Sequence, residues 1–138
     1  MDRPHSYTLY CPPLETSPRI ARDFVQSALR RLRLEDVAPV AALCTSEVAT
    51  NAYLHAPGLG SLLWLAVEVG EVRITVYDGN RDEPVLRPTC VERESGRGLR
   101  LVDGLADAWG TSPGAPLGVG GREGKGVWFT LATPSCLS

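Results

Sequence analysis

The chain has 138 residues, 43% of them hydrophobic and 22% charged, which is typical of one globular domain and unlike a disordered chain. Its 14 basic and 16 acidic residues give a net charge of −2, so charge provides no general affinity for nucleic acid or an anionic membrane. No apolar run is long enough to span a bilayer, no secretory signal is evident, and the four cysteines are scattered without a Cys-x-x-Cys pair. We therefore expect reduced thiols and a cytoplasmic protein.

The first two predicted elements are a strand and a helix. The strand covers residues 6–11 and stops at two prolines. The helix follows Thr16-Ser17-Pro18, which combines a cap residue with a proline suited to the first helical position. Its apolar residues recur at helical spacing on one side: Ile20, Phe24, Val25, Ala28, Leu29 and Leu32. Arginines occupy the other side, which we interpret as a solvated face, the alternative being a docking surface for an acidic partner.

A second helix and a hairpin come next. We expect the helix to run from Asp36, its cap, to His55. Strands over residues 62–69 and 72–77 are then joined by a two-residue turn with Gly70 at its first position. The second of these strands alternates polar residues with apolar residues that should face a core: Val72, Ile74 and Val76.

The remainder of the chain is predicted to be mostly loop before two final strands. Residues 78–97 are charged and lack apolar periodicity, which favours a long functional or mobile loop. A short helix should start near Gly98, a strand at Trp109, and the last strand should cover residues 127–132. Residues 112–124 are rich in glycine and proline and predict a turn region.

The most informative pattern lies on the second helix. Glu47, Asn51 and His55 are spaced four residues apart, so their side chains should point the same way, between apolar positions. A buried carboxylate without partners is costly, so either protein hydrogen bonds satisfy these groups or they serve a ligand. Carboxylate and amide oxygens suit Mg²⁺ that keeps its waters and substrate phosphates, and they suit zinc poorly.

Three further features are ambiguous when taken singly. Asp78 ends an apolar strand before a glycine, where it can be a turn residue or can accept a hydrogen bond from an amino group such as that of adenine. Gly96 and Gly98 open a helix, which can be an ordinary flexible start or a phosphate site built from free amide groups. Lys125, the only lysine, lies in a Gly-Lys-Gly that is not a P-loop and that otherwise reads as a hairpin turn.

Taken in this order, these features resemble the Bergerat-type (GHKL) ATP-binding fold shared by gyrase, Hsp90, histidine kinases and MutL. Within that group, the chain is most similar to the small anti-sigma-factor serine kinases. The resemblance covers about residues 5–133 and is carried by residues 44–56, 76–78, 94–102, 109–110 and 124–128.

The resemblance implies a fold of the α/β class, an α+β two-layer sandwich with helices on one face of a mixed, mostly antiparallel sheet. It implies one ATP-binding domain over residues 5–133, followed by a loose tail over residues 134–138. ATP and Mg²⁺ are the implied cofactors.

The resemblance also assigns roles to individual residues. Asn51 would hold the Mg²⁺ that bridges the ATP phosphates, and Glu47 would be the general base toward a protein serine or a water. Asp78 would accept a hydrogen bond from the adenine amino group. The other implied cofactor-binding residues are Gly96, Arg97, Gly98 and Leu99 around the phosphates, with Lys125 and with Thr130 as a substitute for a family threonine.

Two departures from the family pattern bear on these roles. The glycine box after Asp78 lacks both of its in-register glycines, and Gly126 stands where the family usually carries threonine after Gly-Lys. The expected function is an ATP-binding regulatory protein that transfers the γ-phosphate to a protein serine. Its expected partner is a sigma factor or an anti-sigma-factor antagonist protein, and the family's expected assembly is a homodimer. The alternatives are a non-catalytic nucleotide-binding module that sequesters such a regulator, and a plain ATPase.

Overall fold

A computed structural model of the chain describes residues 5–55, 58–78, 94–113 and 125–134, with side chains described from Leu99 onward in the third stretch. These residues form strands β1 (His5–Cys11), β2 (Ser61–Glu68), β3 (Glu71–Asp78), β4 (Ala108–Pro113) and β5 (Lys125–Ala132), and helices α1 (Ser17–Arg31), α2 (Ala38–His55) and α3 (Glu94–Leu105). Apart from Pro134, the predicted loose tail lies outside the described residues, as do most of the predicted long loop and most of the turn region.

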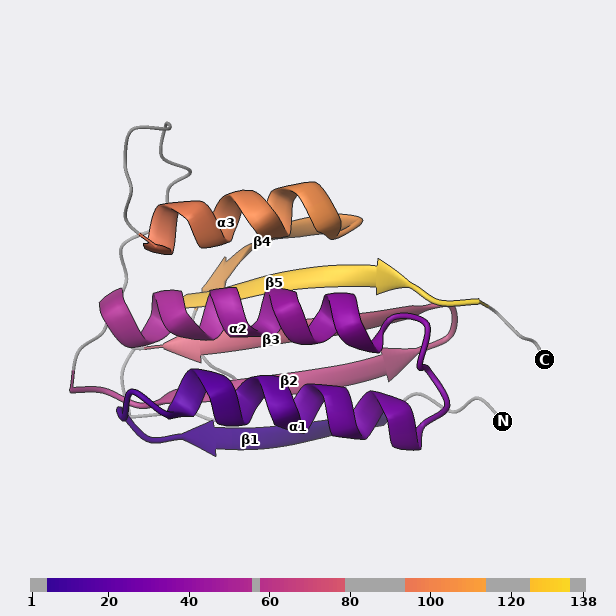
Figure 1. Cartoon of the computed structure of the whole chain (residues 1–138), viewed down its shortest axis with the longest axis horizontal. Helices are drawn as coiled ribbons and strands as arrows, with labels where there is room; N and C mark the ends of the chain where they lie inside the picture. The colour runs from indigo at the N-terminus through magenta and orange to yellow at the C-terminus, as the bar shows by residue number, and fades with distance from the viewer. Residues whose placement is uncertain (1–4, 56–57, 79–93, 114–124, 135–138) are drawn as a thin grey trace.

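The described strands form one sheet in the order β1-β2-β3-β5-β4, and every neighbouring pair is antiparallel. All three helices lie against the same face of this sheet, with α2 between α1 and α3 (Figure 1). The predicted two-layer α+β sandwich is therefore confirmed. Its sheet is antiparallel throughout the described strands, without the parallel pair that a mixed sheet would contain.

The core lies between the sheet and the helices. Val72, Ile74 and Val76 are buried on the inner face of β3, as their alternation predicts. The neighbouring strands add an inner row of the same kind, formed by Leu63 and Leu65 of β2 and by Val127, Phe129 and Leu131 of β5. This core packs against the sheet-facing side of α2.

Helix α2 is buried on more than one side, because it contacts α1 and α3 as well as β3. Cys44 and Val48 are buried, whereas Val40, one turn earlier, is only half-buried. Alanines take up most of the additional contact, and their small side chains allow the neighbouring helices to approach closely. Periodicity alone underestimated this burial, since it assumes one buried face for each helix.

Helix α1 follows its prediction at the start and departs from it at one residue. Thr16 is the cap and Pro18 lies in the first turn, while Val25 and Leu29 are fully buried. Ile20 is 55% exposed, contrary to the expectation that it faces the core. At about 100° per residue, Ile20 lies roughly 140° around the helix from Val25, which is outside the contact with α2.

Two predicted boundaries near α2 and the hairpin are wrong by one or two residues. The first helical bond of α2 runs from the amide of Ala41 to the carbonyl of Val37, so Val37 and not Asp36 is the cap. In the hairpin, Glu68 pairs with Glu71, so Gly70 is the second turn residue and not the first. Its φ of 82° is the reason for glycine at that position.

Helix α3 begins at Glu94, four residues before the predicted start near Gly98. The prediction treated the two glycines as a boundary. Glycine costs only about 1 kcal/mol in a helix relative to alanine, so it does not by itself exclude a helix. Gly96 and Gly98 therefore lie inside the first turns of α3.

Aromatic rings cover part of the sheet face that the helices leave open. A Cβ atom at Gly126 would lie 2.7 Å from Cε1 of Tyr77, and one at Gly110 would lie 2.9 Å from the indole of Trp128. The guanidinium of Arg73 stacks 4.2 Å from the centre of the same indole. Glycine is needed at positions 110 and 126 because the rings lie against the backbone there.

We predict that Gly126→Ala lowers the free energy of unfolding by about 1–3 kcal/mol, since the ring of Tyr77 must move to admit a methyl group. Gly104→Ala in the last turn of α3 is the matched control: its new Cβ meets no atom within 4 Å. The control should gain up to about 1 kcal/mol. Urea denaturation measures both, and equal effects of the two substitutions would contradict the packing of Tyr77 on Gly126.

Candidate functional site

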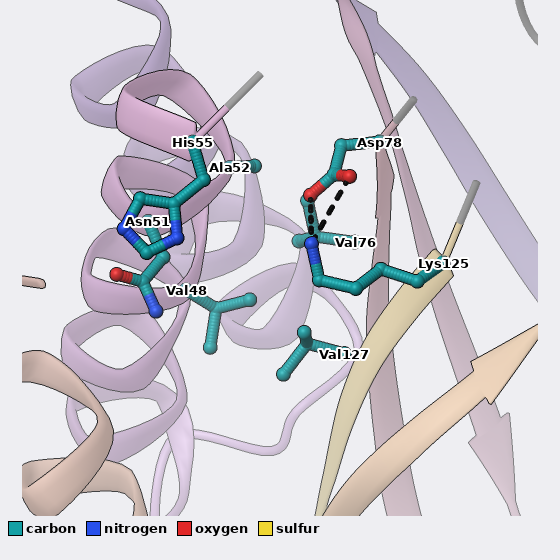
Figure 2. A pocket seen from close by; sticks show the side chains of 8 residues that line it. All are labelled: Val48, Asn51, Ala52, His55, Val76, Asp78, Lys125 and Val127. Atoms are coloured by element: carbon teal, nitrogen blue, oxygen red, sulfur yellow. Dashed lines mark hydrogen bonds and ion pairs between the residues drawn. The ribbon is translucent and has the colours of Figure 1, made fainter. Parts of the chain in front are cut away.

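A small cavity lies between α2 and the inner face of the sheet (Figure 2). It is lined by Val48, Asn51, Ala52 and His55 of α2, by Val76 and Asp78 of β3, and by Lys125 and Val127 of β5. Its volume is about 10 Å³, which leaves room for about one water molecule. Apolar side chains form its walls, and its polar groups come from two opposite elements.

A buried ion pair stands on the sheet side of the cavity. The ammonium Nζ of Lys125 lies 3.1 Å from Oδ2 and 3.2 Å from Oδ1 of Asp78, and donates to both oxygens. The lysine and aspartate side chains are only 7% and 2% exposed. Asp78 and Lys125 are register partners on adjacent strands, which brings the two charges together on the inner face. Each charge offsets part of the cost of burying the other at this depth.

Asn51 stands opposite this pair on α2. Its side chain is 4% exposed and lines the cavity, yet neither Oδ1 nor Nδ2 has a hydrogen-bond partner among the described residues. Leaving a buried polar group unsatisfied costs roughly 1–3 kcal/mol. The hydroxyl of Thr45 is also unsatisfied within the described residues, but it does not line the cavity. Asn51 thus offers a hard acceptor and a donor to whatever occupies the cavity.

Glu47 lies one helical turn before Asn51 in α2 but does not line the cavity with it. Its side chain is half-buried and is not among the residues that line the cavity. Burial of the thiol and then the negative charge of Glu47 raise the pKa of Cys44 to about 11. Cys44 is therefore a neutral thiol at pH 7. Cys44 and Cys11 are both free, as predicted for reduced cysteines.

The remaining predicted site residues are distributed over other parts of the fold. Thr130 lies an odd number of residues from Lys125 along β5, so it faces the aromatic side of the sheet and not the cavity. Leu99 is 1% exposed in α3 and does not line the cavity. Gly96, Arg97 and Gly98 belong to the first turns of α3, and the side chain of Arg97 lies outside the described residues.

The sequence reasoning missed the pairing of Lys125 with Asp78. A usable signal was present: Lys125 shares the strand alternation of Val127, Phe129 and Leu131, which places it on the buried face. The same alternation identifies Val76 and Val127 as apolar walls of the cavity. His55, noted in the sequence only as the continuation of a row, also lines the cavity.

The donor set fits a magnesium ion that arrives with phosphates better than a self-contained metal site. No cluster of three or more His, Cys, Asp or Glu residues that could hold a metal occurs in the described part of the chain. Mg²⁺ commonly takes one or two protein oxygens and completes its shell with water and phosphate. The unsatisfied Oδ1 of Asn51 is such an oxygen.

No protein-family model matches this chain, and no curated protein matches it either. Among the described helices, none combines the length and apolar character needed to cross a membrane. Function must therefore be inferred from the chemistry of the cavity and not from a relative.

We predict that Lys125→Met lowers the free energy of unfolding by about 3–5 kcal/mol, because it removes the ammonium that donates to both oxygens of the buried Asp78 carboxylate. The double variant Asp78→Leu with Lys125→Met removes both charges and should recover most of that loss. Urea denaturation of the wild type, both single variants and the double variant measures the coupling. Additive losses in this cycle would show that the two charges do not stabilise each other.

Proposed function

We propose that this chain is an ATP-binding regulatory protein of the Bergerat (GHKL) type, with the nucleotide bound between α2 and strands β3 and β5. The observation that carries the proposal is Asn51, which lines the cavity and whose two side-chain polar atoms are buried and unsatisfied within the described residues. Within the described residues nothing satisfies this amide, and an unsatisfied buried amide is less stable than an apolar residue of similar size.

Each cavity residue has a role in this proposal. Oδ1 of Asn51 is a ligand for Mg²⁺ on the phosphates, and the carboxylate of Asp78 accepts a hydrogen bond from the amino group of the base. Val48, Val76 and Val127 supply apolar surface for the faces of the base. When bound, Mg²⁺ supplies positive charge that stabilises the negative charge developing on a transferring phosphoryl group.

The cavity volume of about 10 Å³ means that a base can enter only if side chains move. Lys125 is the side chain whose movement matters most, because its aliphatic stem lies between the walls and its ammonium is bonded to Asp78 (Figure 2). We therefore expect the ligand-free protein to differ from the nucleotide complex at this residue.

We predict that Asn51→Leu abolishes nucleotide binding without destabilising the protein. Mg²⁺ and ATP at one hundred times Kd should stabilise the wild type by about 2.7 kcal/mol, measured as a thermal shift. In Asn51→Leu the shift should disappear, while the unfolding free energy without ligand stays equal or rises by up to about 3 kcal/mol.

The matched control for this measurement is Thr50→Ala, on the same helix. The Thr50 hydroxyl donates to the carbonyl of Ser46, and Thr50 does not line the cavity. The control should keep the full nucleotide-dependent shift. Absence of a shift in the wild type with either ATP or ADP would overturn the proposal of nucleotide binding.

Phosphotransfer to a protein serine is the second part of the proposal. In that reaction Glu47 takes the proton of the serine hydroxyl while the serine oxygen bonds to the γ-phosphorus. The bond from the γ-phosphorus to its bridging oxygen breaks, and ADP leaves. The proposal gives this role to Glu47 because it lies one helical turn before Asn51. The substrate or partner that the motif resemblance suggests is a sigma factor or an anti-sigma-factor antagonist protein, in the cytoplasm.

The other candidate function is a non-catalytic nucleotide-binding module that sequesters such a regulator. The position of Glu47 outside the cavity lining favours it, since a general base must reach the reacting hydroxyl. The two functions share the nucleotide site and differ only in whether the γ-phosphate moves.

We predict that Glu47→Gln reduces transfer of labelled γ-phosphate to a serine-containing antagonist protein by at least about 100-fold, with ATP affinity unchanged. The measurement compares label on the antagonist with nucleotide binding by calorimetry, for the wild type and the variant. Transfer that survives the substitution would remove Glu47 as the base. A stable partner complex with no transfer by the wild type would instead support the sequestering module.

A further inference from the structure

Lys125 occupies the position on Asp78 that a nucleobase would need. Its ammonium donates to both carboxylate oxygens at 3.1 and 3.2 Å. An exocyclic amino group of a base makes the same kind of contact, an N–H donated to a carboxylate at about 3 Å. The ligand-free protein therefore already satisfies Asp78 with an internal donor.

The small volume of the cavity is a second, independent reason to expect that Lys125 and a base cannot occupy it together. The cavity holds about one water, and Lys125 is 6% exposed, so its four-carbon stem fills space between the apolar walls. A planar base and the lysine stem cannot both be accommodated there. Among the residues that line the cavity, Lys125 is the longest and has the most rotatable bonds, so it can leave without moving the backbone.

Leaving Asp78 costs Lys125 this ion pair, and the ligand class can supply another anion. A nucleoside triphosphate brings several negative charges with its base, whereas a nucleoside brings none. Moving the ammonium from a carboxylate to a phosphate replaces one ion pair with another. Moving it into water with no anion nearby would lose the pair entirely.

We infer that Lys125 is exchanged for the base: binding of an adenine nucleotide displaces its ammonium from Asp78, and the released charge is then balanced by the phosphates. Lys125 would thereby make the site selective for nucleotides over nucleosides. This inference rests on the proposed nucleotide site and specifies how that site discriminates among ligands.

The sequence permits a direct test, because Lys125 is the only lysine in the chain. Protein grown with lysine labelled with ¹³C at the ε-carbon and ¹⁵N at the ζ-nitrogen gives a single side-chain signal by nuclear magnetic resonance. In the free protein, this buried ammonium should exchange its protons slowly with water. Saturation with Mg²⁺ and ATP should move the signal to a new position. Isothermal calorimetry on the same sample shows independently whether ATP is bound.

A variant tests the selectivity. The ratio of the Kd for adenosine to the Kd for ATP should fall at least tenfold in Lys125→Met, because adenosine no longer has to break the ion pair and ATP loses a cation for its phosphates. Thr50→Ala, which leaves the cavity lining unchanged, should keep the wild-type ratio. If Lys125→Met is too unstable to assay, Lys125→Gln replaces it, because glutamine keeps a donor for Asp78 without the charge.

The outcomes separate this inference from the proposed function. ATP binding detected by calorimetry with an unchanged lysine signal would overturn the exchange and leave the nucleotide site intact. A ratio of the two Kd values that stays within twofold in the variant would overturn the selectivity. No heat and no signal change in the wild type with either ligand would overturn the nucleotide site itself, and the exchange with it.

Discussion

The ion pair between Asp78 and Lys125 constrains the structure more than any other polar contact described in it. Its two residues are 47 positions apart in the sequence and meet because β3 and β5 pair in one register. A slip of one residue would turn Lys125 to the aromatic face and take its ammonium away from the buried carboxylate of Asp78, at a cost of several kcal/mol. The pair therefore specifies the alignment of the two central strands while it occupies the centre of the candidate site.

The same register gives β5 two different faces. Lys125, Val127 and Phe129 face the helices, whereas Gly126, Trp128 and Thr130 face the aromatic side. This division bears on Gly126, which stands where the ATP-binding family that the motifs resemble usually carries threonine. A side chain at position 126 would point away from the cavity and into the ring of Tyr77. A threonine hydroxyl at this position would therefore not reach the cavity. On β5, the polar side chain that faces Asp78 is Lys125.

Helix α2 shows how a candidate site can be retained at the expense of stability. It is packed on several sides by small residues, and most of it could serve as a purely structural element. Asn51 is the exception on the cavity side, because its amide is buried without a partner among the described residues. Natural proteins accept such local costs where a ligand later satisfies the group. The cavity combines that unsatisfied amide with a carboxylate held by an internal cation, so a ligand could satisfy the first and take the place of the cation on the second.

The sequence by itself determined the class of fold, the order of the elements, and the buried row of β3, because strand alternation and helix periodicity are local properties of the chain. It also identified Asn51, Asp78 and Lys125 as candidate ligand-binding residues. It could not separate Glu47 from Asn51 at the cavity, exclude Thr130 from it, or show that Ile20 is exposed, since these depend on which neighbours pack around each element. Only the tertiary structure placed Lys125 on Asp78, because that contact requires two strands, distant in sequence, to meet in one register.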